Sequence, residues 1–294
     1  MAKLDSIVRN IESAIGKTLN NYRLASITGG SINQAHHLQS GQHDYFIKLN
    51  QPHLEHMFEA EARGLEEMRA LQSVRIPEVI CYGQADGYSY LVLEYIKLGS
   101  LCGNAGKLLG SQLAELHSHK HAFFGWNINN TIGSTPQHND RQHDWLTFWQ
   151  QHRLGAQLTI AAKNGFTGRL QLKGQHLLQN LPHFFDNYSP TPSLLHGDLW
   201  GGNAGADSAG NPVIFDPACY YGDRETDMAM TELFGGFDSE FYAAYQASYP
   251  LDPAYKTRKT LYNLYHIINH LNLFGGGYLG QAEAMIDQLL SDIK

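Results

Sequence analysis

The residues best suited to chemistry lie in one short stretch in the second half of the chain. Residues 194–203 read LLHGDLWGGN, and Asp216 follows Asn203 by thirteen residues. Phosphoryl transfer from ATP needs one carboxylate that orients the attacking hydroxyl and accepts its proton. It also needs an amide and a second carboxylate that hold Mg²⁺ against the phosphates. The spacing H-G-D-x-x-x-x-N followed by D supplies this set, so we predict that Asp198 is the catalytic base and that Asn203 and Asp216 are metal ligands. Because isolated aspartates usually cap turns, the prediction depends on the whole pattern.

Two weaker features nearer the N-terminus could supply the nucleotide side of such a site. Gly29-Gly30-Ser31 lies between two predicted strands, where it fits a hairpin turn but could also offer backbone amides to a phosphate. Lys48 lies on the third predicted strand, and Glu61 follows thirteen residues later on a predicted helix. In kinases, a lysine and a glutamate placed in this way position the α- and β-phosphates. Since both features precede the stronger motif in the required order, we predict that these five residues bind ATP.

Hydrophobic periodicity predicts the elements that must position these residues. In the first third of the chain we expect an opening helix, five strands that form an antiparallel sheet, and one inserted helix. The predicted bounds are about 7–15 for the first helix, 24–27, 32–39, 45–49, 78–82 and 88–96 for the strands, and 54–71 for the inserted helix.

Beyond Ser100 the pattern becomes mainly helical. Helices are predicted to end near His117, to span 144–154 and 168–181, and to continue from Thr226 almost to the C-terminus, with one short β insertion at 213–215. This is an α+β, two-lobe architecture. We expect a β-rich ATP-binding lobe over residues 1–96 and a mainly helical catalytic and substrate lobe over residues 97–294, because 294 residues suffice for two such units.

Composition excludes several classes of function. The net charge of −7 argues against general binding to nucleic acid or to anionic membranes, since both require excess positive charge. Cys81, Cys102 and Cys219 are widely spaced and form no C-x-x-C pair, so neither a disulfide framework nor a zinc knuckle is expected. The N-terminus lacks the apolar core of a signal peptide, and no window approaches a membrane span. We therefore expect a cytoplasmic protein.

The sixteen histidines could suggest a metal site or a pH sensor. Several of them, however, lack carboxylate or cysteine partners at metal-ligand spacing, and we expect them to lie on the surface or in loops: His36, His37, His117, His119, His121, His138 and His143. His196 is the one histidine for which we predict a role, which is to shape the catalytic loop.

Several longer motifs resemble the fructosamine-3-kinases, also called ketosamine kinases. They are HGDLWGGN at 196–203, DPACYYGDRE at 216–225, DMAM at 227–230, FGW at 124–126, NTIGSTPQ at 130–137, LFGGF at 233–237 and NHLNLFGGGY at 269–278. The resemblance covers nearly the whole chain. The wider aminoglycoside-phosphotransferase-like kinases share the H-G-D, Asn and Asp residues, but not the Trp-Gly-Gly or NTIGSTPQ elements.

The resemblance implies a protein-kinase-like fold and transfer of phosphate from Mg-ATP to the 3-hydroxyl of a ketosamine, a sugar joined to an amine. The 3-phosphate is unstable and sheds the sugar, so the amine is restored. The resemblance also implies that the backbone of Val92, Leu93 and Glu94 contacts adenine. Trp200 is expected to be a platform for the sugar, although it could equally close the catalytic loop as a core residue. Asp227 is expected to brace that loop by accepting backbone N–H bonds.

Two other readings stay open at this point. One is a different small-molecule kinase, of the aminoglycoside, choline or methylthioribose type. The other is a catalytically inactive nucleotide-binding scaffold, which the presence of Lys48, Asp198, Asn203 and Asp216 together disfavours. We expect a monomer without a phosphorylation-gated switch, because no long activation loop follows Asp216. The residues do not distinguish free from protein-bound ketosamines.

Overall fold

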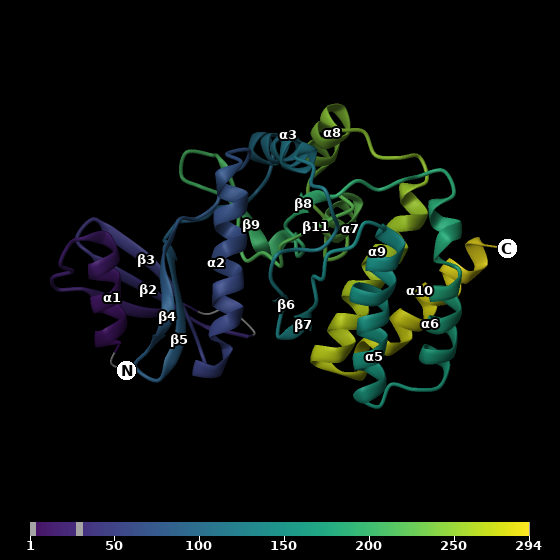
Figure 1. Cartoon of the computed structure of the whole chain (residues 1–294). Helices are drawn as coiled ribbons and strands as arrows, with labels where there is room; N and C mark the ends of the chain where they lie inside the picture. The colour runs from purple at the N-terminus through teal and green to yellow at the C-terminus, as the bar shows by residue number, and fades with distance from the viewer. Residues whose placement is uncertain (1–3, 28–31, 294) are drawn as a thin grey trace.

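The computed structural model describes residues 4–27 and 32–293, and it contains a small β-rich part and a larger, mainly helical part (Figure 1). The elements of the small part are α1 (Asp5–Ile15), β1 (Arg23–Ile27), β2 (Gln34–Ser40), β3 (His43–Asn50), α2 (Glu55–Ala70), β4 (Val79–Ala85) and β5 (Tyr88–Glu94), with a 3₁₀ turn at Pro52–Leu54. The predicted antiparallel sheet with an inserted helix is therefore present.

The sheet separates two hydrophobic clusters. Its strands are antiparallel, in the order β1-β2-β3-β5-β4. Alternate side chains point to opposite faces of a strand. Tyr45, Ile47 and Leu49 of β3 accordingly pack with α1, while Lys48 lies on the opposite face, on the side of α2. Figure 1 shows α1 and α2 on the two sides of the sheet.

The larger part is built mainly from helices. Its helices are α3 (Asn104–Ser118), α4 (Trp145–Phe148), a π-helical segment (Trp149–Leu154), α5 (Gly155–Lys163), α6 (Arg169–Gln179), α7 (Glu225–Thr231), α8 (Ser239–Ser248), α9 (Tyr255–Phe274) and α10 (Leu279–Asp292), with 3₁₀ turns at Leu181–Phe185, Gly201–Asn203 and Gly276–Tyr278. The helix predicted at 144–154 thus continues without a break to Lys163. α3 packs along α8, and α9 packs along α7 and α10.

Three short antiparallel strand pairs interrupt the helices in the described part of this region, so the prediction of a single β insertion is wrong. They pair β6 (Asn130–Ile132) with β7 (Thr135–Gln137), β8 (Ser193–Leu195) with β11 (Tyr220–Gly222), and β9 (Ala204–Ala206) with β10 (Pro212–Ile214). Strands of three residues are too short for an alternating pattern to be visible. In addition, β8 and β11 are far apart in the sequence, so local periodicity cannot reveal their pairing.

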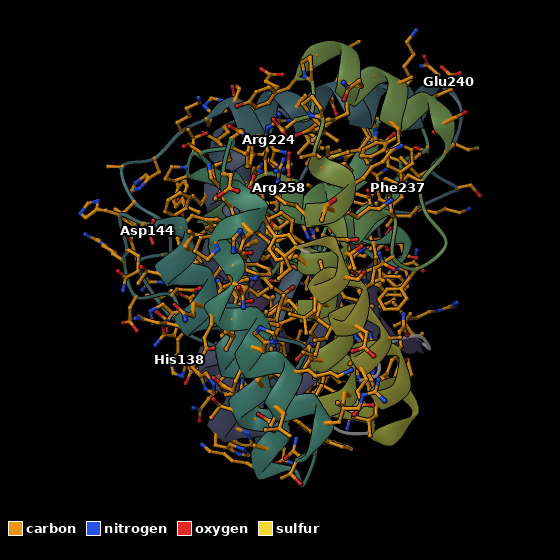
Figure 2. The ribbon with its side chains drawn as sticks, turned by 90° about the vertical axis from the view of Figure 1, so that its right-hand side faces the viewer. His138, Asp144, Arg224, Phe237, Glu240 and Arg258 are labelled. Atoms are coloured by element: carbon orange, nitrogen blue, oxygen red, sulfur yellow. The ribbon has the colours of Figure 1, made fainter. Side chains whose placement is uncertain are left out.

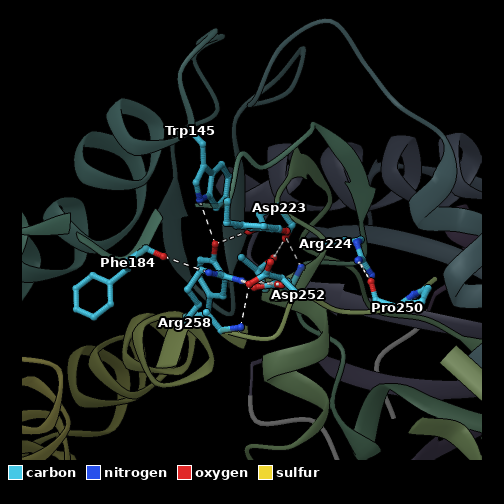
Figure 3. Close-up of polar contacts among 12 residues, drawn as sticks. Trp145, Phe184, Asp223, Arg224, Pro250, Asp252 and Arg258 are labelled. Carbon is cyan, nitrogen blue, oxygen red and sulfur yellow. Dashed lines mark hydrogen bonds and ion pairs between the residues drawn. The ribbon is translucent and has the colours of Figure 1, made fainter. Parts of the chain in front are cut away.

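A buried ionic network ties α9 to the start of α7. Arg258 donates from Nε to Oε2 of Glu225 at 2.7 Å and from Nη2 to Oδ1 of Asp252 at 2.7 Å. Its third partner is the carbonyl oxygen of Phe184, at 3.2 Å (Figure 3). Arg258 lies inside the helical part (Figure 2), where a buried charge is tolerated only when it is paired.

Among the described residues, none of the helices has the length and apolar character needed to cross a membrane.

Candidate active site

Lys48 joins the sheet, helix α2 and the segment after β10. Its Nζ donates to Oε1 of Glu61 at 2.6 Å and to Oδ1 of Asp216 at 2.8 Å. The side chains of Lys48 and Glu61 are nearly buried, whereas that of Asp216 is 49% exposed. Asp216 has a φ of +61°, an unusual backbone conformation for a residue other than glycine. The three residues predicted from distant parts of the sequence are therefore in direct contact.

The charges in this triad shift one another's pKa values. Burial opposes the charged form of Lys48, but the carboxylates of Asp216 and Glu61 outweigh it and raise its pKa. Burial raises the pKa of Glu61 to about 7, although Lys48 opposes that shift. Partial burial also raises the pKa of Asp216, but the charge of Lys48 outweighs it and the net shift is downward. Asp216 is therefore the carboxylate of the triad that most strongly keeps its negative charge.

The predicted catalytic loop, residues 196–203 between β8 and β9, places Asp198 next to Asn203. The Nδ2 of Asn203 donates to the backbone oxygen of Asp198 at 2.9 Å and to its Oδ2 at 3.2 Å. The backbone N–H of Phe215 donates to the carbonyl oxygen of Asn203 at 3.1 Å, so the β9–β10 hairpin brings Asn203 close to Asp216. Burial, followed by the nearby charge of Asp216, raises the pKa of Asp198 to about 8. Burial therefore favours the protonated form of Asp198 more than in a free aspartate, while Asn203 fixes the orientation of its carboxyl group.

His196 is the first residue of this loop, and its side chain is buried. Its hydrogen bonds fix its tautomer. Nε2 lies 2.9 Å from the carbonyl oxygen of Phe215, which can only accept, so Nε2 carries the proton. Nδ1 then accepts from the backbone N–H of Asp198 at 3.3 Å. The side chain therefore connects the backbone of the catalytic loop to the residue that precedes Asp216.

Asp227, at the start of α7, accepts from the backbone of the same loop. Its Oδ2 accepts from the N–H of His196 at 2.7 Å, and its Oδ1 accepts from the N–H of Gly197 at 2.8 Å. Gly197 has a φ of +82°, and a Cβ there would lie 2.1 Å from the carbonyl oxygen of Ala218, so only glycine fits. Burial opposes the charge of Asp227, but the hydrogen bonds from His117 and from the backbone N–H of Gly197 outweigh it and lower its pKa.

His117 corrects one of the sequence-based expectations. It is fully buried, not a surface or loop residue. Its Nε2 lies 3.2 Å from Oδ2 of Asp227, and its Nδ1 lies 2.8 Å from the hydroxyl of Tyr245. A carboxylate can only accept, so Nε2 donates to Asp227 and Nδ1 accepts from Tyr245. The position of His117 on the buried stripe of α3, four residues after Leu113, was the one signal that could have identified it.

We expect the His117→Phe variant to be less stable by about 2 kcal/mol, because Asp227 loses a donor and the hydroxyl of Tyr245 loses its acceptor. Urea unfolding of the variant and of wild type measures this loss. His119→Phe, two residues away on the exposed surface, is the matched control. Equal midpoints for all three proteins would show that His117 does not support the loop.

Trp200 lies at the surface of the catalytic loop and is 38% exposed. Its indole packs edge-on against Phe234, with ring centroids 6.2 Å apart, and covers Gly202. A Cβ at Gly202 would lie 2.3 Å from the indole, so Gly202 is needed to make room for Trp200. Gly201–Asn203 forms a 3₁₀ turn, and neither Gly201 nor Gly202 has a positive φ.

The predicted adenine contacts need correction. Val92 and Leu93 lie inside β5, paired with β3 on one side and with β4 on the other, so the sheet engages their backbone groups. The N–H of Glu94 donates to the carbonyl oxygen of Glu78 at 2.8 Å, and its carboxylate pairs with Arg75. Within the described part of the chain, the backbone of 96–98 makes no hydrogen bond. Gly29, Gly30 and Ser31 lie outside the described residues.

A cavity of about 480 Å³ adjoins the catalytic loop. It lies between the segment that leaves the sheet, the Trp-Gly-Gly turn and the start of α8. Its lining residues are Leu98, Gly99, Ser100, Leu101, Gly201, Ala204, Gly236, Phe237 and Asp238. Space for a molecule larger than a phosphate is thus present beside Asp198's loop.

The donor set fits Mg²⁺ better than a transition metal. No group of three or more His, Cys, Asp or Glu side chains is arranged to hold a metal ion within residues 4–27 and 32–293. Asp216 offers a half-exposed carboxylate, and the Oδ1 of Asn203 takes part in no hydrogen bond with the described residues. Mg²⁺ commonly binds through one or two such oxygens together with phosphates and water.

The chain is similar to known proteins over nearly its whole length. The sequence model of the family described as fructosamine kinase matches residues 3–292. A probable ketoamine kinase of Synechocystis is 45% identical over 290 residues, which cover 98% of this chain and 97% of that protein. The chloroplastic protein-ribulosamine 3-kinase of Arabidopsis thaliana is 42% identical over 282 residues, which cover 95% of this chain and 86% of that protein.

Solved structures show the same relationship. The crystal structure of a putative fructosamine-3-kinase from Haemophilus somnus superimposes with a TM-score of 0.89 at 28% identity, and covers 97% of this chain and 96% of its own. A thermostable mutant of an aminoglycoside phosphotransferase gives a TM-score of 0.62 at 14% identity, over 97% of this chain and 98% of its own. The second likeness concerns the fold alone, which is the protein-kinase-like fold expected from the sequence.

Proposed function

This chain belongs to the fructosamine kinase family, and we propose that it transfers the γ-phosphoryl group of ATP to the 3-hydroxyl of a ketosamine. The observation that carries the proposal is the contact of Lys48 with Asp216 at 2.8 Å, beside a loop that holds Asp198 against Asn203. These four side chains are the ones that phosphoryl transfer requires. The names of the relatives, ketoamine kinase and protein-ribulosamine 3-kinase, supply the class of substrate.

Asp198 acts as the base in this proposal. Its Oδ2 is oriented by the amide of Asn203, and its raised pKa suits it to accept the proton of the attacking hydroxyl. His196 and Asp227 hold the backbone of the loop, so Asp198 does not have to reorganise when the substrate arrives. The geometry therefore favours deprotonation of a hydroxyl that lies directly in front of the loop.

Residues of both the β-rich part and the helical part would hold the phosphates. Lys48, fixed by Glu61, would contact the α- and β-phosphates. Asp216 and Asn203 would hold Mg²⁺, which when bound neutralises charge on the phosphate oxygens. The backbone of 96–98 replaces Val92 and Leu93 as the candidate adenine contact, because its N–H and C=O groups make no hydrogen bond with the described residues.

The sugar would lie against Trp200, beside the loop that carries Asp198. The indole offers an apolar face to the sugar ring, and its exposed position leaves that face accessible. Phosphorylation at the 3-hydroxyl gives a product that sheds the sugar and restores the amine. The proposed role of the protein is therefore deglycation.

We expect Gly202→Ala to raise the KM for the ketosamine, because the new methyl group displaces the indole of Trp200. The expected increase is about tenfold, which corresponds to a loss of about 1.4 kcal/mol of binding free energy. The KM for ATP should not change. Gly201→Ala is the matched control, since a Cβ at Gly201 meets no atom within 4 Å. Steady-state kinetics with each substrate varied measures both constants. Equal ketosamine KM values for the two variants would remove Trp200 from the substrate site.

The alternative function is phosphorylation of a different small molecule, because the chain shares its fold with aminoglycoside phosphotransferases. The test is incubation of the protein with ATP and Mg²⁺ and a panel that contains a fructosamine, a ribulosamine, an aminoglycoside and choline. Mass spectrometry then identifies any phosphorylated product. We expect product from the ketosamines alone. Phosphorylation of the aminoglycoside or of choline alone would overturn the proposal, and a reaction that persists when Mg²⁺ is removed with EDTA would overturn the metal assignment.

A further inference from the structure

Glu67, on helix α2, binds two side chains of the larger part of the molecule. Its Oε2 accepts from the indole Nε1 of Trp126 at 2.6 Å, and its Oε1 accepts from the hydroxyl of Tyr221 at 2.5 Å. Trp126 is buried, and Tyr221 is half-buried in strand β11. Both oxygens of one carboxylate are thus used by donors that lie outside the sheet.

The same face of α2 rests on the segment that follows Asp216. A Cβ at Gly64 would lie 3.0 Å from the Cβ of Cys219 and 3.6 Å from the side chain of Pro217. The helix therefore approaches this segment as closely as glycine allows. Gly64 and Glu67 lie on adjacent turns of α2. The two contacts therefore fix the distance of α2 from the segment after Asp216 and the rotation of α2 about its own axis.

The two donors to Glu67 are themselves held firmly. The N–H and the carbonyl oxygen of Tyr221 exchange two hydrogen bonds with the backbone of Gly125, each at 2.9 Å. Gly125 directly precedes Trp126, so the two donors belong to one backbone unit. The ring of His121 stacks on Tyr221 with centroids 4.1 Å apart. This unit is a rigid partner for the carboxylate of Glu67.

We propose that Glu67 is a positioning residue, which fixes α2 on the 216–221 segment and so keeps Glu61 and Lys48 aligned with Asp216. Glu61 and Glu67 are six residues apart, about 9 Å along a helix, so a rigid α2 transmits the position of one to the other. The inference rests on the proposed function, because Lys48 must contact phosphate for its alignment to matter. It also gives a structural role to the FGW and DPACYYGDRE motifs, which contain the two donors to Glu67, Trp126 and Tyr221.

The test compares Glu67→Leu with Glu67→Gln. Leucine fills the space but leaves the Trp126 and Tyr221 donors without an acceptor. Glutamine can accept from Trp126 through its oxygen and donate through its amide to the hydroxyl of Tyr221, so it should restore the contact. Glu66→Leu, at the exposed neighbouring position, is the matched control. Tyr221→Phe removes one of the two hydrogen bonds without touching α2, and it serves if Glu67→Leu fails to fold.

We expect Glu67→Leu to lower kcat/KM for ATP by about tenfold, which corresponds to 1.4 kcal/mol, with Glu67→Gln and Glu66→Leu close to wild type. Tyr221→Phe should show a smaller loss in the same constant. Hydrogen exchange should be faster in α2 of Glu67→Leu, and unchanged in α1. Wild-type kinetics in Glu67→Leu, or the same loss in Glu67→Gln, would overturn the inference.

A background variant separates this inference from the proposed function. If Glu67 acts through Lys48, Glu67→Leu should have little further effect on kcat/KM for ATP when Lys48→Met is already present. If Lys48→Met alone leaves the ATP dependence unchanged, the phosphate role of Lys48 is wrong. If Lys48→Met is impaired and the two losses are independent and additive, the phosphate role stands and the positioning role of Glu67 is wrong.

Discussion

Asp198→Asn is expected to lower kcat by about 10³-fold while the Kd for ATP stays close to that of wild type. Asparagine has the shape of aspartate, and its oxygen can still accept from the amide of Asn203, so the loop keeps its geometry. Its amide cannot take the proton of the attacking hydroxyl. Rapid-quench measurement of phosphorylated ketosamine gives kcat, and calorimetric titration with a non-hydrolysable ATP analogue gives the affinity.

The control for this prediction is Asp186→Asn, which makes the same chemical change at an exposed position. The pH dependence supplies a second readout. Asp198 accepts a proton only when it is ionised, so the wild-type rate should fall as the pH drops through the pKa of Asp198. The residual rate of Asp198→Asn should not show that fall at low pH. A kcat within the range of the Asp186 control would exclude Asp198 as the base.

Lys48→Met is expected to lower kcat/KM for ATP by about 10²-fold, because the phosphates lose a charged donor in a partly buried site. Methionine keeps most of the stem volume, so packing between the sheet and α2 is largely preserved. The substitution leaves Glu61 buried without its cation, but Glu61 already has a pKa of about 7 and can become neutral by taking up a proton. The fold should therefore survive at neutral pH.

Thermal unfolding with and without ATP and Mg²⁺ checks both halves of the Lys48 prediction. Lys48→Met should unfold as a cooperative protein, and ATP should raise its midpoint less than that of wild type. Lys17→Met, at an exposed position beyond α1, is the matched control. An unaltered ATP-dependent shift in Lys48→Met would mean that Lys48 serves only to pair the carboxylates of Glu61 and Asp216.

The contacts described above join the nucleotide side and the catalytic side of the site through few residues. Lys48 connects the sheet to Asp216, and Glu67 connects α2 to the segment after Asp216. Asp227 connects α7 to the catalytic loop and is itself held by His117. The carboxylates of Glu67 and Asp227 are buried or half-buried and each accepts from more than one donor, so removal of a single donor has a measurable cost.

The sequence alone determined what depends on short-range geometry. Asp198 and Asn203 are five residues apart in one loop, and their contact is local, so the H-G-D-x-x-x-x-N spacing was sufficient to predict it. The face of the sheet that carries Lys48 follows from strand alternation, since side chains of a strand point to opposite sides at every step. The order of the elements in the first third of the chain and the α+β class followed from hydrophobic periodicity, which is also a local property of the sequence.

Tertiary structure decided the contacts between residues that no local period relates. Lys48 and Asp216 are 168 positions apart, and His117 and Asp227 are 110 positions apart, so chain connectivity carries no information about their distance. The need for glycine at 202 arises from the indole folded over it, and the loss of Val92 and Leu93 as adenine contacts arises from strands on both sides of β5. Such facts depend on which surfaces pack together, and packing is a property of the whole folded chain.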